Sequence, residues 1–320
     1  MKKSAWFCSM LLLAIGAAQG WQTVLSSHER DLIAEGITID PQSGDLYVSS
    51  ILRRKIVRVN SRGWQDFIGS GQDGFMGGVG LHVDARHRIL WACSGNIMGA
   101  RYRTGIFAYD LKRKKLWKRF LLPSGPEPRF FNDLAIAADG SVYITDTMGH
   151  CLWKWNRAAA EPVKLSLGDL PYPNGIALAA DPRFLFVATR QGLKRVDLTG
   201  QRTELLAMPA GPDHSMGLDG IAWYRGSIVA VQNGVADKAQ CRIVRYHLAT
   251  DGRSVSRVET IDTGNPAFDI PTTLTVDGDR LYVLANSQLD NLDQERLVIR
   301  APERLKPTVI LVYRLRDGAG

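Results

Sequence analysis

The chain has 320 residues, 45% of them hydrophobic, and a formal net charge of +8 at pH 7. After residue 20, no apolar run approaches the roughly 20 residues that a membrane-spanning helix requires. The basic residues are spread along the chain and do not gather with aromatic residues in one segment. This distribution argues against a nucleic-acid partner and favours anionic small molecules.

Residues 1–20 have the composition of a secretory signal. Lys2 and Lys3 precede an apolar run, and small residues follow it up to Gly20. We expect cleavage after Gly20, a periplasmic or secreted protein, and no membrane contact once the signal is removed. The alternative is that the same segment anchors the chain in a membrane. Residues 21–320 are expected to form one domain.

Three cysteines remain after residue 20, namely Cys93, Cys151 and Cys241. An odd number excludes complete pairing into disulfides. No pair has the spacing of a metal-binding CxxC motif. We therefore expect buried free thiols.

A pattern of short strands separated by turns recurs six times. The copies begin at Glu35, Val79, Asn132, Asn174, Asp219 and Thr272. A repeat of about 40–50 residues made only of strands is typical of a β-propeller, in which each repeat forms one four-stranded blade. The sequence thus predicts an all-β fold, a six-bladed β-propeller.

The two ends of the chain are expected to share the last blade. The sixth copy shows only three strands of its own, at residues 274–276, 280–284 and 309–315. Residues 21–27 alternate like a strand and precede the first copy. We expect them to supply the outer strand of blade six, which closes the ring and removes an open sheet edge.

Three long loops follow second strands, at residues 94–104, 232–240 and 286–308. Two strand lengths return the chain to its starting rim, so these loops should lie beside the first residues of the copies and wall a site. The last loop is long enough for a short helix around residues 293–298. Residues 69–74 fit G-x-G-x-x-G, but no helix pattern follows, so we expect a crossing between blades rather than a nucleotide loop.

Four of the six leading positions carry oxygen-bearing side chains: Glu35, Asn132, Asn174 and Asp219. The first strand of each blade lines the central channel, so these residues should meet at one mouth. Two carboxylates and two amides are hard oxygen donors, which suit Ca²⁺, Mg²⁺ or Mn²⁺ better than Zn²⁺. The alternative is that Asn and Asp before Gly simply begin turns.

Four segments resemble the senescence marker protein/gluconolactonase family, also called regucalcin-like. They are AEGI (34–37), RFFNDLAIAADG (129–140), YPNGIAL (172–178) and LDGIAW (218–223). The resemblance spans essentially all of residues 21–320, and the family is similar in fold to paraoxonases. It implies one divalent cation, with Ca²⁺ as the first candidate and Mg²⁺, Mn²⁺ or Zn²⁺ as alternatives. Glu35, Asn174 and Asp219 match the family's metal ligands, and Asn132 matches an asparagine that contacts metal or substrate.

The sequence departs from the family pattern at three points. Phe130 stands where the family often has a substrate-binding arginine, and Arg129 is its neighbour. The histidine of paraoxonases has no counterpart, because Val79 and Gly80 occupy that region and His82 lies farther along the strand. An aspartate often found after the second strand of blade four is replaced by Thr189 and Arg190.

The resemblance implies hydrolysis of a lactone or related cyclic ester. Asp219 is the expected general base and Glu35 the second candidate. Substrate contacts are expected from Asn132, Arg129, Arg190 and His214; for His214 the alternative is a surface histidine with no role. The rim arginines either favour an anionic substrate or form a solvated rim; they are Arg53, Arg54, Arg101, Arg103 and Arg190.

A second function remains open, because a fold does not determine an activity. The same sequence is compatible with a secreted propeller that binds a small ligand or a protein without turnover. The partner expected from the first hypothesis is a small-molecule substrate, and the protein is expected to act as a monomer.

Overall fold

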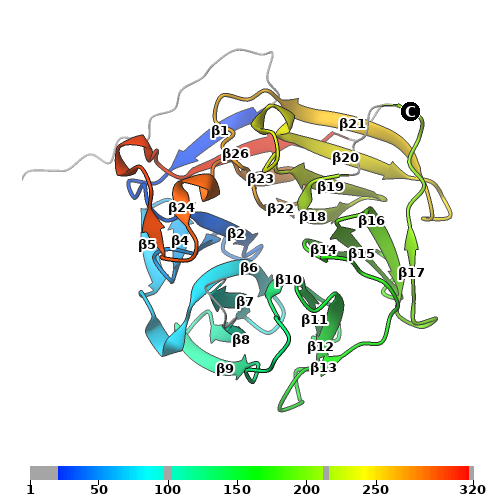
Figure 1. Cartoon of the computed structure of the whole chain (residues 1–320), viewed down its shortest axis with the longest axis horizontal. Helices are drawn as coiled ribbons and strands as arrows, with labels where there is room; N and C mark the ends of the chain where they lie inside the picture. The colour runs from blue at the N-terminus through cyan, green and yellow to red at the C-terminus, as the bar shows by residue number, and fades with distance from the viewer. Residues whose placement is uncertain (1–20, 97–102, 212–215, 317–320) are drawn as a thin grey trace, which may run out of the picture.

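The six repeats form six four-stranded antiparallel sheets in a computed structural model that describes residues 21–96, 103–211 and 216–316. The sheets are arranged around one central axis (Figure 1). The predicted six-bladed β-propeller is confirmed. The signal segment 1–20, His214 and Arg101 lie outside the described residues. Within those residues, no helix has the length and apolar character needed to span a membrane.

The first three blades follow the chain from the inner strand to the outer strand. Blade one contains β2 (Ala34–Ile39), β3 (Leu46–Ser50), β4 (Lys55–Asn60) and β5 (Gly63–Ile68); blade two contains β6 (Gly77–Asp84), β7 (Ile89–Asn96), β8 (Arg103–Asp110) and β9 (Lys115–Leu121); blade three contains β10 (Phe131–Ile136), β11 (Val142–Asp146), β12 (Cys151–Trp155) and β13 (Val163–Lys164).

The next two blades repeat this order, and the last blade joins both ends of the chain. Blade four contains β14 (Ile176–Leu178), β15 (Phe184–Thr189), β16 (Gly192–Asp197) and β17 (Arg202–Leu205); blade five contains β18 (Leu218–Tyr224), β19 (Ser227–Gln232), β20 (Arg242–Leu248) and β21 (Val255–Thr263); blade six contains β22 (Leu274–Asp277), β23 (Arg280–Leu284), β26 (Val309–Arg314) and β1 (Trp21–Ser26).

The N-terminal strand closes the ring as the sequence predicts. β1 pairs antiparallel with β26, and Val24 lies opposite Leu311. β26 in turn pairs with β23, so the outer strand of blade six comes from the opposite end of the chain. β1 thereby covers the edge that β26 would otherwise expose.

Apolar side chains between the blade faces form the core. Trp91 of blade two and Trp155 of blade three meet edge to face, with ring centroids 5.3 Å apart. Phe186 of blade four stacks on Trp223 of blade five at 5.8 Å. Each sheet packs between two neighbours, so its second strand is buried on both faces and reads as a continuous apolar run, as in β7 and β15.

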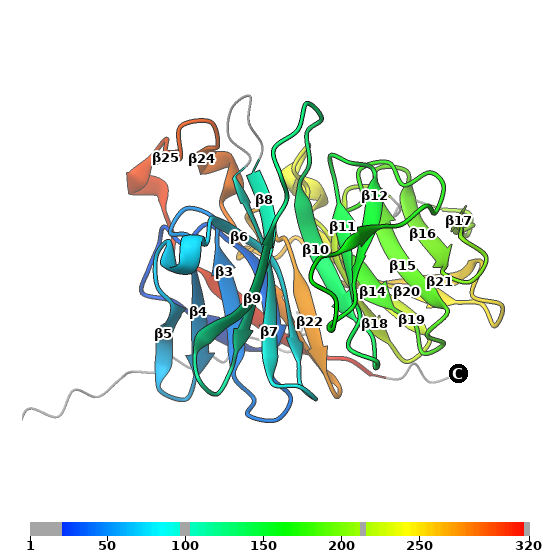
Figure 2. The same cartoon turned by 90° about the horizontal axis from the view of Figure 1, so that it is seen from below.

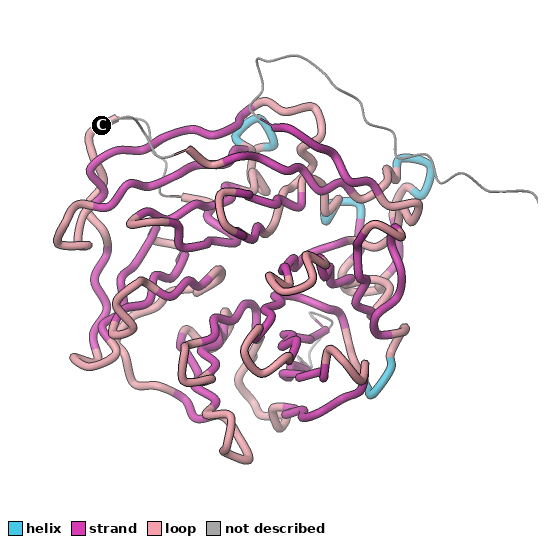
Figure 3. The backbone as a smooth tube through the Cα atoms, turned by 180° about the vertical axis from the view of Figure 1, so that it is seen from behind, coloured by secondary structure: helices cyan, strands magenta, loops and turns pink. Residues whose placement is uncertain are grey.

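Helical structure among the described residues is limited to short 3₁₀ turns (Figure 3): η1 (Gln72–Gly74), η2 (Lys238–Gln240), η3 (Leu289–Asn291) and η4 (Pro302–Arg304). The first of these lies in the G-x-G-x-x-G segment, which crosses between blades one and two as predicted. Cys93, Cys151 and Cys241 are buried and free, also as predicted.

The predicted helix at residues 293–298 is wrong. The segment instead forms a hairpin of β24 (Leu292–Asp293) and β25 (Val298–Ile299). The carboxylate of Asp293 accepts hydrogen bonds from the backbone N–H groups of Glu295 and Arg296, and Leu297 has a positive φ of 50°. Local side-chain bonding of this kind favours a turn over a helix. The hairpin stands on one rim of the propeller (Figure 2).

Candidate functional site

The inner strands are irregular where the leading residues lie. In blade one the register between β2 and β3 shifts between Ala34 and Ile37, so that one extra residue is accommodated around Glu35. Equivalent shifts surround Asn132 in β10 and Asp219 in β18. A β-bulge re-aims side chains and interrupts the alternation of a strand. The bulges thus allow consecutive residues to face the channel.

Hydroxyl groups on the neighbouring strands satisfy the bulged backbone. The N–H of Gly36 donates to Oγ of Ser49 at 2.8 Å, and Ser49 donates to the carbonyl of Val79 in the next blade at 2.6 Å. In blade three the N–H of Asp133 donates to Oγ1 of Thr145 at 2.9 Å. These bonds fix the inner strands relative to one another and hold the leading residues in place.

Glu35 and Asp219 are the two buried carboxylates of the predicted site. Glu35 is 7% exposed and Asp219 is 4% exposed. Oε2 of Glu35 and Oδ1 of Asp219 are buried and make no hydrogen bond with any described residue. Burial raises the pKa of Glu35 well above its ordinary value, and the charges of Asp219 and Asp133 raise it further. The two side chains are therefore close enough to interact.

Asparagines surround the Asp219 carboxylate. Nδ2 of Asn233, which follows β19, donates to Oδ2 of Asp219 at 3.0 Å. Burial raises the pKa of Asp219 to about 6, although hydrogen bonding from Asn233 and Asn174 opposes the shift. Of these two asparagines, Asn174 was predicted as a site residue from the sequence and Asn233 was not.

Asn132 is held at the mouth by blade three. It is buried, and its Nδ2 donates to Oγ1 of Thr147 at 3.0 Å. Thr147 donates in turn to the carbonyl of Pro173, next to Asn174, at 2.6 Å. The amide nitrogen is thus used for positioning, and the carbonyl oxygen points away from Thr147.

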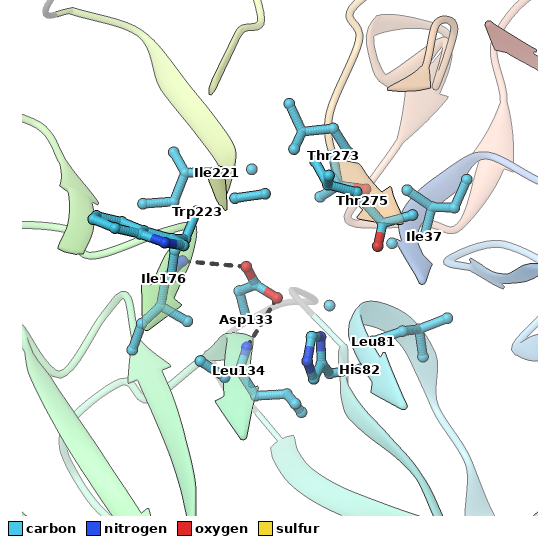
Figure 4. A pocket seen from close by; sticks show the side chains of 18 of the residues that line it. Ile37, Leu81, His82, Asp133, Leu134, Ile176, Ile221, Trp223, Thr273 and Thr275 are labelled. Atoms are coloured by element: carbon cyan, nitrogen blue, oxygen red, sulfur yellow. Dashed lines mark hydrogen bonds between the residues drawn. The ribbon is translucent and has the colours of Figure 1, made fainter. Parts of the chain in front are cut away.

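Asp133 is a third carboxylate at the site and was not predicted from the sequence. Its two oxygens accept backbone N–H bonds from Leu134 at 2.8 Å and from Ile176 of blade four at 3.3 Å (Figure 4). Burial raises its pKa to about 7, the two backbone bonds oppose the shift, and the charge of Asp219 adds to it. The signal in the sequence was that most other copies have glycine at this position.

Below the leading residues, the channel contains a cavity of about 210 Å³. The inner strands of all six blades line it, and Asp133 and His82 are its titratable side chains (Figure 4). Burial lowers the pKa of His82 to about 4, against a smaller opposing effect of Asp84. His82 is therefore neutral at pH 7 and does not compensate the carboxylates above it.

Glycines after the leading residues let the inner strands approach closely. A Cβ on Gly36 would lie 2.1 Å from the carbonyl oxygen of Val79, and one on Gly175 would lie 2.3 Å from that of Asp219. Neither distance is possible for a real side chain. The Glu-Gly, Asn-Gly and Asp-Gly pairs of the sequence thus have a packing role in addition to the chemistry of their first residue.

The carboxylates and asparagines fit a divalent cation. Among the described residues, no three His, Cys, Asp or Glu side chains form a group that could hold a metal ion. A cation at the mouth would therefore need amide or water oxygens in addition to those of Glu35 and Asp219. The buried carboxylate oxygens without partners are consistent with such a ligand, because unpaired buried acceptors are costly.

The other predicted substrate residues have different surroundings. Arg129 forms ion pairs with Glu127 at 2.7 Å and with Asp146 at 3.4 Å. Arg190 is exposed, and its guanidinium stacks on the ring of Tyr172 at 4.2 Å, on the same rim as Asn174. His214 lies in a segment that the structure does not describe.

The rim arginines are also unlike one another. Arg53 pairs with Asp31, and Arg54 lies against Gly71. Arg103 is exposed at the start of β8. Arg101 is not among the described residues.

No protein-family model and no curated protein match the sequence. Solved structures do resemble it. A gluconolactonase from Xanthomonas campestris matches 93% of this chain and 92% of its own, with a TM-score of 0.62 and 15% identity. The calcium-binding protein regucalcin from Agrobacterium tumefaciens matches 91% and 94%, with a TM-score of 0.57 and 18% identity.

A virginiamycin B lyase from Staphylococcus aureus also matches 82% of this chain and 81% of its own, with a TM-score of 0.57 and 16% identity. These likenesses define the structural class, a six-bladed β-propeller that includes the gluconolactonase and regucalcin expected from the sequence motifs. At such low identity they establish the fold and leave activity to the site itself.

Proposed function

We propose that this protein is a divalent-cation-dependent hydrolase of a lactone or related cyclic ester. The observation that supports the proposal is the pair Glu35 and Asp219, two buried carboxylates that each have one oxygen without a partner among the described residues. Buried groups with raised pKa values and incomplete hydrogen bonding are typical of functional sites. The motifs around both residues also resemble those of the gluconolactonase family.

Glu35, Asn174, Asp219 and Asn132 would hold the cation. All four offer hard oxygen donors, so Ca²⁺ is the first candidate, and Mg²⁺, Mn²⁺ or Zn²⁺ are the alternatives. When bound, the cation would stabilise negative charge that develops on the carbonyl oxygen of the substrate.

Asp219 is the proposed general base. Asn233 uses one lone pair of Oδ2, so Oδ1 is the freer oxygen and takes the proton from water, while Oδ2 keeps a lone pair for the cation. The water oxygen then bonds to the carbonyl carbon, the ring C–O bond breaks, and the proton passes to the departing alkoxide. In the cation-free protein burial raises the pKa of Asp219 to about 6, so the carboxyl is already ionised at pH 7 and can accept a proton. Glu35 is the second candidate for this role.

Substrate contacts are proposed for Asn132, Arg129, Arg190 and His214. Arg190 is best suited to an anionic substituent, because it is exposed and stacked on Tyr172. Arg129 would have to exchange its ion pair with Glu127 for the substrate.

The test is a lactone panel assayed with each of the four cations, on residues 21–320, before and after treatment with a chelator. We expect hydrolysis that the chelator abolishes and that Glu35→Gln and Asp219→Asn reduce by at least about 100-fold. Glu161→Gln, an exposed glutamate, is the matched control and should leave the rate unchanged. Cation binding with no turnover of any lactone would overturn the proposal in favour of a non-catalytic ligand-binding propeller.

We also propose that residues 1–20 export the protein to the periplasm or beyond and that the mature chain acts as a monomer. The N-terminus of the exported protein, measured by mass spectrometry, should be Trp21. Light scattering of that protein should give the mass of one chain.

A further inference from the structure

The insertion in blade six builds a second cavity, distinct from the central channel. The β24–β25 hairpin rests on blade one, where Leu292 and Leu305 pack with Ile33 and Ile51 in one apolar cluster. All of these except the hairpin strand residue Leu292 lie outside regular strands. The hairpin is therefore fixed to the rim by buried apolar contacts.

Between the hairpin and the rim lies a cavity of about 70 Å³. Its walls are apolar side chains from three separate parts of the chain: Ile51, Met76, Leu292 and Leu297. Gly77 and Gly95 also line it without side chains of their own. A Cβ on Gly77 would lie 2.7 Å from the carbonyl oxygen of Gly95, so no side chain fits at this position of the wall.

The cavity lies on the rim that carries the leading residues, beside the start of β6. Gly77 precedes Val79 by two residues, roughly 7 Å of extended chain. The carbonyl of Val79 faces Gly36, the neighbour of Glu35. Gly95 faces the ring of Phe130, which precedes Asn132 by two residues. The cavity and the leading residue Glu35 thus lie on one rim, at the junction of blades one and two.

Polar groups mark the edge of the cavity. Arg54, Asn96 and Gln294 are the other described residues of its lining. Arg54 is exposed, and its guanidinium forms no ion pair with any described residue. The apolar walls end at this polar edge, so the length of chain that the cavity accommodates is limited.

We propose that this cavity binds a short alkyl substituent on the ring of the substrate, so that the preferred substrate is an alkyl-substituted lactone and not a bare or polyhydroxylated one. The inference rests on the proposed function for the identity of the ring. The alkyl selectivity rests on the cavity alone. A volume of about 70 Å³ holds a chain of about four carbons.

The test compares γ-butyrolactone with γ-octalactone, which carries a butyl group on the same ring. We expect kcat/KM to be about 10- to 100-fold higher for γ-octalactone, mainly through KM, because a remote apolar group binds equally in the ground and transition states. A longer octyl chain should bring no further gain.

Two substitutions in the cavity refine the test. Met76→Trp fills the cavity and should remove the preference for the butyl group, measured as the ratio of kcat/KM for γ-octalactone to kcat/KM for γ-butyrolactone. Leu297→Ala widens the cavity and should shift the preference to longer chains. Val163→Trp, at an exposed position on the outer strand of blade three, is the control and should leave the preference intact.

Binding of the corresponding lactams, measured by titration calorimetry, separates this inference from the proposed function. If no lactone is hydrolysed but the butyl lactam binds at least tenfold more tightly than the unsubstituted one, and Met76→Trp removes the difference, the cavity is assigned correctly and the hydrolase proposal fails. If lactones are hydrolysed with no preference for the butyl group, or with a preference that Met76→Trp leaves intact, the cavity inference is wrong and the hydrolase proposal stands.

Discussion

Asn233 donates a 3.0 Å hydrogen bond from its side-chain amide to Oδ2 of Asp219, while Oδ1 of the same carboxylate is buried and has no partner among the described residues. The two residues come from adjacent strands of blade five, Asp219 from β18 and Asn233 from the end of β19. The bond fixes the orientation of the carboxylate and presents one oxygen to the mouth. Asn233 is thus a positioning residue for the proposed site.

Asn233→Ala should weaken both cation binding and hydrolysis by about 10- to 100-fold, the usual effect of losing a group that orients a metal ligand. Cation affinity is measured by titration calorimetry and the rate with the preferred lactone. Gln65→Ala, an exposed amide on the outer strand β5, is the control and should change neither. Unchanged cation affinity in Asn233→Ala would show that the bond is structural only.

The buried Asp219 should make the cation-free protein less stable as pH rises. Its pKa is about 6 in the folded protein and 3.8 without the burial. A carboxyl with a raised pKa holds its proton more tightly in the folded state. The free energy of unfolding is therefore largest below about pH 4. It falls by about 3 kcal/mol as pH rises to about 6, because the folded state then has to hold Asp219 as a buried charge.

Asp219→Asn removes this titration and tests the sign. In chelator at pH 8 the variant should have a free energy of unfolding about 3 kcal/mol larger than the wild type, and the difference should shrink toward pH 4. Urea unfolding at both pH values measures it. Saturating Ca²⁺ at pH 8 should reverse the order, because only the wild type then gains the full free energy of cation binding. A variant that is less stable than the wild type in chelator at pH 8 would contradict the electrostatic account.

The sequence predicted the architecture through features that depend on local chemistry. The repeat length defined the blades, and turn glycines such as Gly44 and Gly140 have the positive φ that their turns require. The missing strand of blade six could be predicted because residues 21–27 alternate between apolar and polar residues as a strand does, and every other copy already has its own strands. Glu35, Asn174 and Asp219 were found because each leads its copy.

Asp133 and Asn233 were missed for physical reasons. In a regular strand Asp133 would point away from the side chain of Asn132, but the bulge in β10 allows both to serve the channel. A bulge depends on how two strands pair and leaves little trace in a single sequence. Asn233 reaches Asp219 across a strand pair, and its role appears only when the register is known.

Gly175→Ala should disrupt the packing of the inner strands. The added methyl group would lie 2.3 Å from the carbonyl oxygen of Asp219 and 2.7 Å from the backbone nitrogen of Ile221. Backbone atoms cannot move aside as a flexible side chain can, so we expect a loss of at least about 1–3 kcal/mol in the free energy of unfolding. Reduced cation affinity should accompany it.

Gly125→Ala is the matched control for that substitution. Nothing lies within 4 Å of a Cβ built on Gly125, and the residue has no positive φ. Its free energy of unfolding should stay within about 0.5 kcal/mol of the wild type. Equal unfolding midpoints for the two variants would show that blades four and five adjust to the methyl group.

Closure of the ring by β1 should govern both stability and solubility. Val24 and Leu25 pack against the apolar clusters on the two sides of blade six, and β1 pairs with β26 along its length. A chain that begins at Ser27 would expose the edge of β26. Compared with residues 21–320, we expect it to melt at a lower temperature and to associate through that edge.

Leu25→Ala separates packing from pairing in the same strand. It keeps the backbone hydrogen bonds of β1 and removes a partly buried side chain, so it should lower the free energy of unfolding by about 1–2 kcal/mol without causing association. Thermal unfolding and light scattering measure the two effects. If the chain that begins at Ser27 stays monomeric and melts at the temperature of residues 21–320, then blades one to six close without their N-terminal strand, and β1 has no role in holding the ring together.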